Sequence, residues 1–479
     1  MELSRAAIVA ELQQILGPDH VVTDEHILRE RSIDNFRKLE SIFGTYTLPP
    51  PAAVAMVRST EDVANVLAFA DRHGINVVPR TGGTATEGGL ETVVPDSIVV
   101  DGSEMNRILS IDPYDMQATC QCGVPLQALE ERVREVGLTT GHSPQSKPVA
   151  HMGGLVATRS IGQFSTLYGG IEDMVVGLEA VFPGGEVTRI KNVPRRAAGP
   201  DIRHVGIGNE GALCFITEVT VKLFPYVPEN NVFLGWTLGS MKTGFEVLRE
   251  VMVAGYKPSV ARLYDPEDGS IHFSHFARPD ECVLLFMAEG AAGIAKATAE
   301  GIAEIVARHP ECSPVDGQVI QEWFEDLTWG PDKIAAEDER IRTTRNVNRT
   351  TEVSAGWSSI HDIYEAAVAR IRAEIPGITL LGGHSSHSYV NGTNMYFNYF
   401  YDLGDVPPEE EATRIYLPII SIICEETLRR GGSIVHHHGI GKARARWVRD
   451  EYGSSYSILE TLKKAFDPKG VMNKGTIIP

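Results

Sequence analysis

Two hydrophobic periodicities alternate along the chain and predict a mixed α+β protein. An apolar run over residues 52–59 is typical of a strand, and apolar residues then recur at helical spacing between Ser59 and Gly74. Ser59 suits the first position of that helix, and Gly74 suits its end. A second strand over residues 75–79 leads directly into a glycine-rich turn.

The next part of the chain is rich in strands. A glycine pair at 184–185 predicts a tight hairpin, and a segment over 141–170 packs small and hydroxyl residues over a length that is uncommon for a mere connection. We therefore expect that segment to bind a ligand. The alternating pattern predicts strands over residues 97–101, 107–111, 116–122, 174–182 and 186–190, a glycine-led turn into a strand over 209–223, and a helix from Pro125 to about Gly137.

From residue 233 onward the order of elements changes to strand, helix, strand, strand, helix. That order is typical of an antiparallel sheet covered by helices on one side. Residues 316–348 look polar and irregular, and the sheet pattern resumes within residues 376–400. We expect strands over 233–238, 259–264 and 281–288, and helices over 241–256, 293–309 and 358–374.

Composition and charge restrict the class of protein. The chain has 479 residues, of which 43% are hydrophobic and 22% charged, as in ordinary globular proteins of two or three domains. No apolar run reaches transmembrane length, so we expect a cytoplasmic protein without strong membrane association. A net charge of −19 disfavours nucleic acid as a partner, and an anionic substrate would need a local basic pocket.

Cysteine spacing gives no sign of metal or redox chemistry. The six cysteines are scattered, and the one close pair, Cys120 and Cys122, lacks CxxC spacing. We expect free thiols.

The turn after the strand over 75–79 is a candidate anion cradle. It reads Arg80-Thr81-Gly82-Gly83-Thr84, and the missing β-carbons let the backbone approach a ligand and point N–H groups at it. A plain glycine turn is an equally good interpretation of this pattern alone. Neither GxGxxG nor GxxxxGK[ST] occurs here, which disfavours a Rossmann or P-loop site.

Three consecutive histidines near the C-terminus are the main candidates for proton chemistry. His436, His437 and His438 precede a Gly-Ile-Gly turn, and titratable rings are not what a packed strand requires. If the run were a strand, His436 and His438 would share a side, and His384 and His387 could join them around a metal ion. Lys442, Arg444 and Arg446 alternate after the turn, and we expect at least two of them to be solvated.

Three segments resemble, in order, the FAD-binding module of the vanillyl-alcohol oxidase superfamily, the PCMH-type fold. They are residues 77–89, 157–187 and 210–223, and the resemblance covers roughly residues 48–226. It implies a two-subdomain FAD-binding fold. In that fold the loop after the strand over 75–79, called the early loop from here on, holds the FAD diphosphate, and the later segments enclose the rest of the FAD. Berberine-bridge-type relatives carry a flavin-linking histidine in that loop, and this chain has none there, so we expect non-covalent FAD. The residues that the resemblance assigns to FAD are Pro79, Arg80, Thr81, Gly82, Gly83, Thr84, Ala85, Pro144, Thr158, Arg159, Ser160, Gly162, Thr166, Gly169, Glu210, Gly211, Ile216 and Thr217.

Four further strings are most similar to the alkyldihydroxyacetonephosphate synthase family: residues 262–268, 341–345, 388–397 and 436–447. The related glycolate and lactate dehydrogenases carry GHxGDGN and a later Glu-His pair. Here residues 384–394 lack the aspartate, and His437 stands at the glutamate position. The resemblance divides the chain into an N-terminal helical segment (1–47), an FAD-binding domain (48–226), an antiparallel-sheet cap domain for the substrate (227–430), and a histidine loop and helix returning to the FAD domain (431–479).

The resemblance also assigns roles, each with an ordinary structural alternative. Tyr389 matches the proton donor or acceptor of the family, or is a packed core tyrosine. Arg342 matches the substrate phosphate ligand, or is a solvated charge near acidic residues. Arg262 and Lys442 are further substrate-binding candidates. His436, His437 and His438 complete the expected catalytic group, and we expect no metal because no carboxylate of the dehydrogenase motif is present.

In the resembled family, flavin N5 holds the dihydroxyacetone phosphate skeleton while a fatty acid leaves and a fatty alcohol enters, without net oxidation. The resemblance therefore implies a His/Tyr acid–base pair acting with flavin N5 on a small anionic substrate. The alternative is hydride transfer to FAD from an alcohol or 2-hydroxy acid, which uses the same residues. A non-catalytic flavin-binding module is a third possibility, and the resemblance also admits a homodimer.

Overall fold

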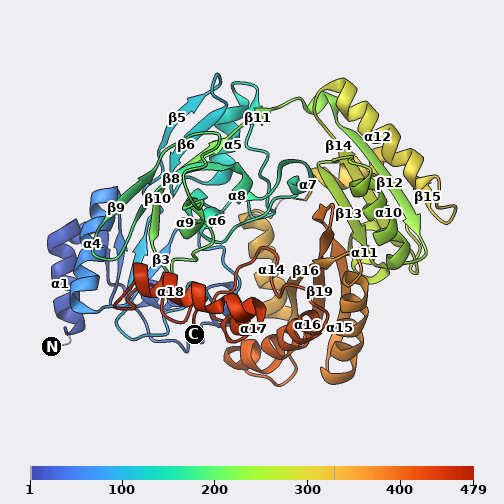
Figure 1. Cartoon of the computed structure of the whole chain (residues 1–479). Helices are drawn as coiled ribbons and strands as arrows, with labels where there is room; N and C mark the ends of the chain where they lie inside the picture. The colour runs from blue at the N-terminus through green and yellow to red at the C-terminus, as the bar shows by residue number, and fades with distance from the viewer. Residues whose placement is uncertain (1–2, 328) are drawn as a thin grey trace.

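The first of three larger sheets lies in the N-terminal part of the protein, in a computed structural model that describes residues 3–327 and 329–479 (Figure 1). Its strand order is β1-β2-β4-β3, with β2, β4 and β3 parallel and β1 antiparallel at the edge. Helix α1 packs against α4 and the sheet, so the N-terminal helical segment belongs to this layer. The elements are α1 (Arg5–Leu16), β1 (Val21–Val22), α2 (Glu25–Glu30), α3 (Lys38–Phe43), β2 (Ala53–Met56), α4 (Thr60–His73), β3 (Val77–Arg80) and β4 (Ile98–Asp101).

Local sequence explains where α4 begins and ends. The Ser59 hydroxyl accepts a hydrogen bond from the Asp62 backbone N–H, and Gly74 adopts a left-handed φ of 70° after the last turn. The face that carries Val63, Val66 and Leu67 is buried. The helix predicted between Ser59 and Gly74 is confirmed.

The second sheet is antiparallel, with strand order β5-β6-β10-β8-β9. Gly184 and Gly185 join β8 to β9 with φ of 89° and 87°, which confirms the predicted hairpin. The two-subdomain arrangement expected for this half is thus confirmed. The elements are β5 (Ile108–Asp112), β6 (Gln117–Gln121), α5 (Leu126–Arg134), β7 (Leu138–Thr139), α6 (Met152–Ala157), α7 (Ser165–Tyr168), α8 (Ile171–Met174), β8 (Val175–Val181), β9 (Val187–Ile190), α9 (Arg203–Gly206), β10 (Phe215–Lys222) and β11 (Phe224–Pro225), the last pairing with β7.

The third sheet is larger and entirely antiparallel among the described residues. Its order is β15-β12-β14-β13-β17-β19-β16, and β18 pairs with β19. The predicted antiparallel cap sheet is confirmed. Its strands are β12 (Val232–Leu238), β13 (Val260–Tyr264), β14 (Cys282–Ala288), β15 (Ser313–Val315), β16 (Asn346–Gly356), β17 (Ile378–Ser385), β18 (Ser388–Tyr389) and β19 (Gly392–Asp402).

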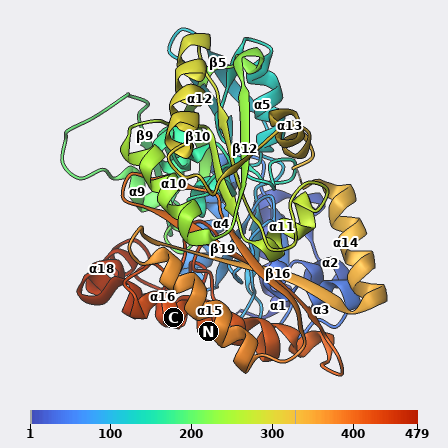
Figure 2. The same ribbon diagram turned by 90° about the vertical axis from the view of Figure 1, so that its right-hand side faces the viewer.

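Helices cover both faces of this sheet, whereas the sequence predicted one. On β13, Ala261 and Leu263 join the main core, while Val260 and Tyr264 join a smaller cluster on the opposite face. The first face carries α10 (Met241–Val253), α12 (Ala292–Val306), α15 (Ile360–Glu374) and α16 (Leu417–Arg429). The second face carries α11 (Pro266–Phe273) and α13 (Gly317–Glu325), as Figure 2 shows from the side.

The segment predicted to be irregular, 316–348, contains two helices and the start of β16. These are α13 and α14 (Pro331–Thr344). Within α14 only Ile341 is buried, so the helix has little apolar periodicity to reveal it in the sequence.

The C-terminal segment runs back from the third sheet to the first, along the lower side of the molecule in Figure 1. Val77 of β3 donates to the Val471 carbonyl at 2.8 Å, and Asn473 donates back to the Val77 carbonyl at 2.8 Å. The helices here are α17 (Val448–Tyr452) and α18 (Tyr456–Phe466). This return brings the histidine run between the two halves of the protein.

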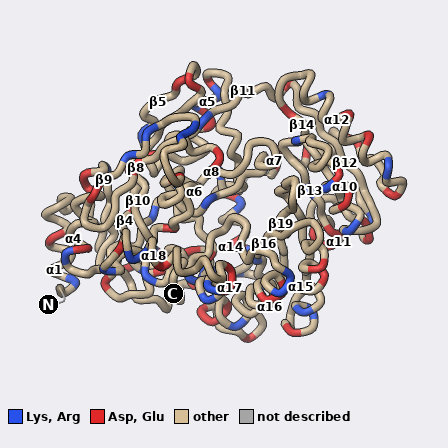
Figure 3. The backbone as a smooth tube through the Cα atoms, viewed as in Figure 1, with Lys and Arg blue, Asp and Glu red and all other residues tan. Residues whose placement is uncertain are grey.

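Charged residues of both signs are spread along the chain in all parts of the molecule (Figure 3). None of the described helices is both long enough and apolar enough to span a bilayer.

Candidate active site

The floor of the candidate site is a row of four residues across the third sheet. In the strand registers Tyr264 of β13 lies opposite His384 of β17, His384 opposite Tyr396 of β19, and Tyr396 opposite Glu352 of β16. Residues that are direct cross-strand neighbours share one face. The rings of Tyr264, His384 and Tyr396 accordingly stack, with centroid separations of 4.7 and 4.8 Å.

The histidine run lies over the end of this row as a loop, not as the strand that the sequence suggested. The fully buried Glu352 carboxylate holds it, because it accepts the backbone N–H of His436 on one oxygen and of His438 on the other, the latter at 2.9 Å. Carboxylates that accept N–H groups in this way make strong hydrogen bonds. Glu352 therefore fixes the path of the loop and so the directions of the three imidazoles.

A second carboxylate, from the FAD-binding half, holds the Gly-Ile-Gly turn. Glu210 accepts the N–H groups of Ile440 and Gly441 at 2.8 and 2.7 Å. Gly439 has a φ of 87°, and a β-carbon there would lie 2.9 Å from the Glu210 side chain. Burial raises the pKa of Glu210 to about 7, although the two N–H donors oppose this shift.

Arg444 is fully buried and Lys442 is held by internal hydrogen bonds, which together correct the expectation that at least two of the three alternating cations are solvated. Its guanidinium donates to the Glu87 carboxylate at 2.9 and 3.0 Å and to the Ile434 and Glu352 carbonyls. Arg446 is exposed and lies over the Trp447 ring at 4.0 Å. A buried charge is tolerated only when it is paired, and the Arg444–Glu87 pair joins the histidine loop to the glycine-rich early loop.

Lys442 has hydrogen-bond partners within the protein, and its predicted substrate-binding role stays a prediction. Its ammonium donates to the Asn473 and Thr476 side chains at 2.8 and 2.9 Å, and lies 3.4 and 3.3 Å from the Gly88 and Gly89 carbonyls. An ammonium has three donors, which these oxygens occupy. The observed role is to tie the C-terminal segment to the early loop.

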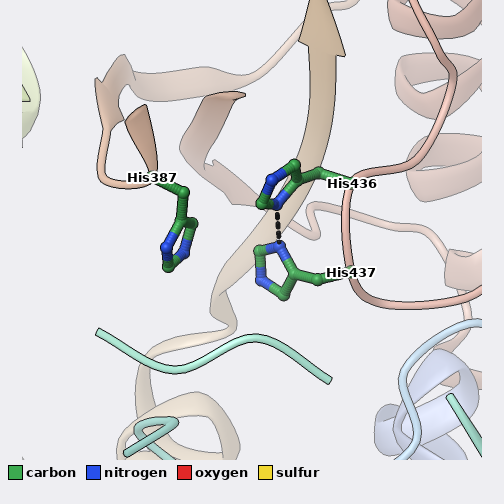
Figure 4. Close-up of side chains that lie close together, drawn as sticks. All are labelled: His387, His436 and His437. Atoms are coloured by element: carbon green, nitrogen blue, oxygen red, sulfur yellow. Dashed lines mark hydrogen bonds between the residues drawn. The ribbon is translucent and has the colours of Figure 1, made fainter. Parts of the chain in front are cut away.

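The histidines come together with Tyr389, as Figure 4 shows in part. The Tyr389 hydroxyl lies 2.7 Å from His436 Nε2, and His436 Nδ1 lies 2.9 Å from His437 Nδ1. His387 stacks on His436 with ring centroids 5.1 Å apart, and its Nδ1 is 2.7 Å from the Ser165 hydroxyl of the FAD-binding half. The predicted catalytic group is thus one cluster at the junction of the two halves.

Burial dominates the protonation of this cluster. It lowers the pKa of His436 and of His437 to about 3, with further lowering from nearby cationic groups, and it lowers the pKa of His387 and His438 well below the usual range. Burial also raises the pKa of the Tyr389 hydroxyl. At neutral pH the imidazoles are therefore uncharged and Tyr389 keeps its proton.

Within this cluster, the histidines whose positions suit a metal ion are only partly the predicted ones. Ring nitrogens of His387, His436 and His437 lie within 4.8 Å of one another, whereas the sequence had suggested His436 with His438, joined by His384 and His387. Two of these nitrogens already bond to each other, and a third faces Ser165. The expectation that the site works without metal stays a prediction.

Arg262 lies beside the row, on the same face of β13 as Tyr264. It is 4% exposed, donates to the Tyr264 hydroxyl at 2.5 Å, and lies 5.5 Å over the Trp323 ring. Its buried Nε has no hydrogen-bond partner among the described residues. A buried guanidinium with a free N–H suits an anionic ligand, and the predicted substrate role of Arg262 stays a prediction.

Arg342 lies elsewhere. It is on the exposed side of α14, where it pairs with Glu339 at 2.6 Å and donates to the Ile42 carbonyl at 3.2 Å. Its side chain is 50% exposed. The described contacts do not bring it to the histidines, and its predicted substrate role stays untested.

The early loop meets the requirements of a diphosphate cradle. No backbone N–H from Thr81 to Thr86 donates a hydrogen bond within the described part of the chain, although the loop lies between buried strands. A β-carbon on Gly82 would come 2.6 Å from the Val149 carbonyl, and Gly83 has a φ of 73°. The residues present therefore fit a phosphate-bearing cofactor at this loop.

The other predicted cofactor residues lie mostly on loops around the same region. A β-carbon on Gly162 would meet the Ser143 N–H at 2.4 Å, and one on Gly211 would meet Pro79 at 2.8 Å, so these loops pack closely. Thr166 Oγ1 accepts from the Ser388 N–H at 3.4 Å, which links this region to the cap. Ile216 and Thr217 are instead buried in β10, where the Thr217 hydroxyl donates to Glu179.

Several site residues were missed from the sequence. Glu352 and Glu87 follow no motif, and their partners lie 84 or more and 357 positions away. Tyr396 and Asp268 fall inside strings used for the resemblance, but nothing in those strings marks them as site residues.

Comparisons with known proteins agree with this geometry. Residues 51–191 match the FAD binding domain family, and residues 227–477 match the C-terminal domain of FAD linked oxidases. These matches make FAD the cofactor of this chain, as predicted, and its place at the early loop stays a prediction.

Three relatives align over almost the whole chain. The FAD-linked oxidoreductase YgcU of Escherichia coli (strain K12) is 65% identical over 100% of this chain and 99% of its own. The alkyldihydroxyacetonephosphate synthase of Trypanosoma brucei brucei is 27% identical over 98% of this chain and 80% of its own. The mitochondrial D-lactate dehydrogenase [cytochrome] of Arabidopsis thaliana is 25% identical over 98% of this chain and 80% of its own.

The fold is also found in solved structures. The crystal structure of p-cresol methylhydroxylase with substrate bound superposes on this chain with a TM-score of 0.76 at 17% identity. The superposition covers 98% of this chain and 96% of the other. These findings confirm the resemblance expected from the motifs.

Proposed function

Because the chain belongs to the family of FAD-linked oxidases, we propose that this enzyme oxidises a small anionic hydroxy compound beside the Tyr389–His436 pair. The observation that carries this proposal is the 2.7 Å contact between the Tyr389 hydroxyl and His436 Nε2, inside a buried group of imidazoles. Folding alone has no need of such a group, since each buried polar ring costs free energy unless it is paired.

The substrate class follows from Arg262. Its buried guanidinium has a partner on one nitrogen and none on Nε, and a carboxylate in that position would complete its hydrogen bonding. One buried arginine matches one carboxylate, and a 2-hydroxy acid carries both the anion and the oxidisable carbon. We therefore place the carboxylate at Arg262 and the hydroxyl toward the imidazoles.

Bound FAD supplies a two-electron acceptor. The chain supplies the proton chemistry. Tyr389 keeps its proton at neutral pH because burial raises its pKa, so its single O–H can donate either to His436 Nε2 or, when the hydroxyl turns, to a substrate oxygen. His436 is uncharged because burial lowers its pKa to about 3, so it can accept the Tyr389 hydrogen bond.

A second candidate is the redox-neutral exchange of alkyldihydroxyacetonephosphate synthases. Its support is the alignment with relatives of that name over 98% of this chain and the resemblance of residues 436–447 to that family. The place of Arg342 weighs against it, because the residue expected to hold the phosphate is half exposed and paired with Glu339. Both reactions would use flavin N5 with the Tyr389 and His436 pair.

The deciding experiment mixes holoenzyme with 2-hydroxy acids, simple alcohols or an acyl-dihydroxyacetone phosphate without oxygen. We expect a 2-hydroxy acid to bleach the flavin absorbance and to yield one 2-oxo acid per flavin. Fatty-acid release from the acyl substrate without bleaching would select the exchange reaction and reject the oxidation.

Tyr389→Phe tests the residue that carries the proposal. Removing a hydroxyl at an acid–base site costs about 100-fold in rate or more. The matched control is Tyr114→Phe, because the Tyr114 side chain is 95% exposed. Equal bleaching rates for the two variants, each with full FAD content, would reject the assignment of Tyr389.

A further inference from the structure

We propose that His384, held by Asp268, is the general base that takes the substrate hydroxyl proton in this site. The inference deepens the proposed function and rests on it, because it names the acceptor of the proton that hydroxy-acid oxidation releases. The histidine run, to which the sequence pointed, then shapes and lines the site instead of accepting that proton.

The geometry of the pair carries the inference. His384 Nδ1 lies 2.6 Å from one oxygen of Asp268, which is fully buried, and Asn398 donates to the other oxygen at 2.9 Å. A carboxylate facing Nδ1 fixes the proton on that nitrogen and leaves Nε2 as the acceptor. Within the described chain Nε2 has no hydrogen bond, and the His384 side chain is 14% exposed, so this nitrogen remains open to a ligand.

The surrounding structure holds the pair rigidly. Asp265 accepts the Asp268 N–H at 2.7 Å at the start of α11 and the Gly383 N–H at 2.8 Å in β17. A β-carbon on Gly382 would lie 2.4 Å from the Asp268 N–H, so glycine there lets α11 approach the strand. One aspartate and two glycines thus set the distance between Asp268 and His384.

His384 faces the same site as the histidine run. Tyr396 stacks on His384 with centroids 4.8 Å apart and on His437 with centroids 5.9 Å apart. Tyr264 covers the other face of His384, and its hydroxyl bonds to Arg262. A carboxylate at Arg262 would therefore bring the neighbouring hydroxyl of the same small substrate next to His384.

Other imidazoles of the site are poorer acceptors. Burial and neighbouring cationic groups lower the pKa of His436 and His437 to about 3, and each lacks a carboxylate at hydrogen-bond distance from its ring. For Asp268, burial opposes ionisation, but its contacts with His384 and Asn398 outweigh burial and lower its pKa. An ionised Asp268 stabilises a protonated His384.

The proton and electron balance closes with FAD as the oxidant. The substrate O–H bond breaks and its proton bonds to His384 Nε2, forming an imidazolium paired with Asp268. The electron pair left on the oxygen forms the new C=O bond. At the same time the C–H bond breaks, and the carbon gives a hydride, which carries two electrons and one proton, to FAD. Product release and loss of the His384 proton to solvent restore the base.

The titratable and charged groups that face His384 come from the elements packed against it. They are Asp268 and His272 of α11, Arg262 and Tyr264 of β13, Tyr396 of β19, His387 of the turn after β17, and His437 of the histidine loop.

The first test measures the rate of anaerobic flavin bleaching by a 2-hydroxy acid against pH, in holoenzyme. We expect His384→Gln to lower the rate by about 100-fold to 10,000-fold with FAD retained, and imidazole to restore part of the rate in His384→Ala. On the acidic side of the profile, the pH at which the rate is half its maximum should be lower in Asp268→Asn, because the carboxylate that favours the imidazolium is gone.

Matched controls are His309→Gln and Glu250→Gln, a second histidine–carboxylate pair 3.2 Å apart, in which Glu250 lies in α10 and His309 in the turn after α12. They should leave the rate and its pH profile unchanged. A wild-type rate and profile in both His384→Gln and Asp268→Asn would overturn the inference while the bleaching itself upheld the proposed function.

The second test needs no substrate. Carbethoxylation of each histidine by diethyl pyrocarbonate is followed by peptide mass spectrometry across pH, with FAD bound. We expect His384 to react, and its half-reaction pH to fall in Asp268→Asn. An unreactive His384, or an unshifted pH, would overturn the inference even if no hydroxy acid bleaches the flavin.

Discussion

Glu352→Gln tests whether one buried carboxylate sets the shape of the histidine loop. The two oxygens of Glu352 accept the N–H groups of His436 and His438, and the side chain is fully buried. Glutamine has nearly the same volume but only one acceptor oxygen, so its NH₂ group would face one of the two backbone donors. One strong hydrogen bond is lost, and a buried N–H is left without a partner.

The expected loss of local stability is about 2 to 3 kcal/mol, the usual contribution of a hydrogen bond to a charged group. Arg444 keeps its pair with Glu87, so the loss should remain local. A change of about 2 kcal/mol corresponds to roughly 30-fold faster opening of the loop. Turnover should fall as well, because the imidazoles lose their fixed directions.

Hydrogen exchange of the peptide over residues 433–444, followed by mass spectrometry, measures this opening directly. Glu339→Gln is the matched control, because the Glu339 side chain is 62% exposed and its pair with Arg342 is worth about 0.5 kcal/mol at most. Identical exchange of this peptide in Glu352→Gln and Glu339→Gln would refute the view that Glu352 holds the loop.

Four further predictions concern the cofactor, acid stability, metal dependence and Arg342. Acid precipitation should release FAD into the supernatant, and Gly83→Val should reduce FAD content, since valine is strained at a φ of 73°; flavin in the pellet, or full FAD in the variant, would contradict them. The pKa of His437 is about 3 in the folded protein and 6.5 in the unfolded chain, so stability is lost as pH falls below about 6.5. The free energy of unfolding, measured by denaturant titration, should therefore fall between pH 7 and pH 5 by about 2 kcal/mol more in wild type than in His437→Gln. EDTA treatment should leave flavin bleaching unchanged if the cluster works without metal. Arg342→Met should leave FAD content intact and, if Arg342 binds the substrate anion, weaken substrate binding by about 2 to 5 kcal/mol, as measured by equilibrium titration. Unchanged affinity would show that Arg342 is a solvated surface charge without a role in substrate binding.

Local features of the fold could be predicted from the sequence, because the interactions that form them span few residues. The helix from Ser59 to Gly74 and the hairpin at Gly184 each depend on caps or turn residues within one short window. The helix α14 escaped prediction because its exposed faces are polar and only Ile341 is buried. Apolar periodicity in a sequence reflects the buried face of a helix, so a helix with few buried residues shows little periodicity.

The site was predictable only in part, because its supports come from distant positions. The imidazoles, Tyr389 and Arg262 are distinctive residues in short strings, so the sequence could suggest them. Arg444 could not be assigned in this way, because its burial depends on Glu87, 357 positions earlier. Alternation with Lys442 and Arg446 suggested a solvated face, and tertiary pairing overrode it.

Two carboxylates from opposite halves of the protein hold the same short loop, and this arrangement explains how the halves cooperate. Glu210, in the FAD-binding half, accepts the N–H groups of the Gly-Ile-Gly turn, while Glu352, in the cap sheet, accepts those of His436 and His438. Arg444 adds the Glu87 end of the early loop to the same unit. A shift of either half would have to break buried, charge-assisted hydrogen bonds, so the imidazoles stay fixed relative to both the cofactor loop and the substrate-facing row of the sheet.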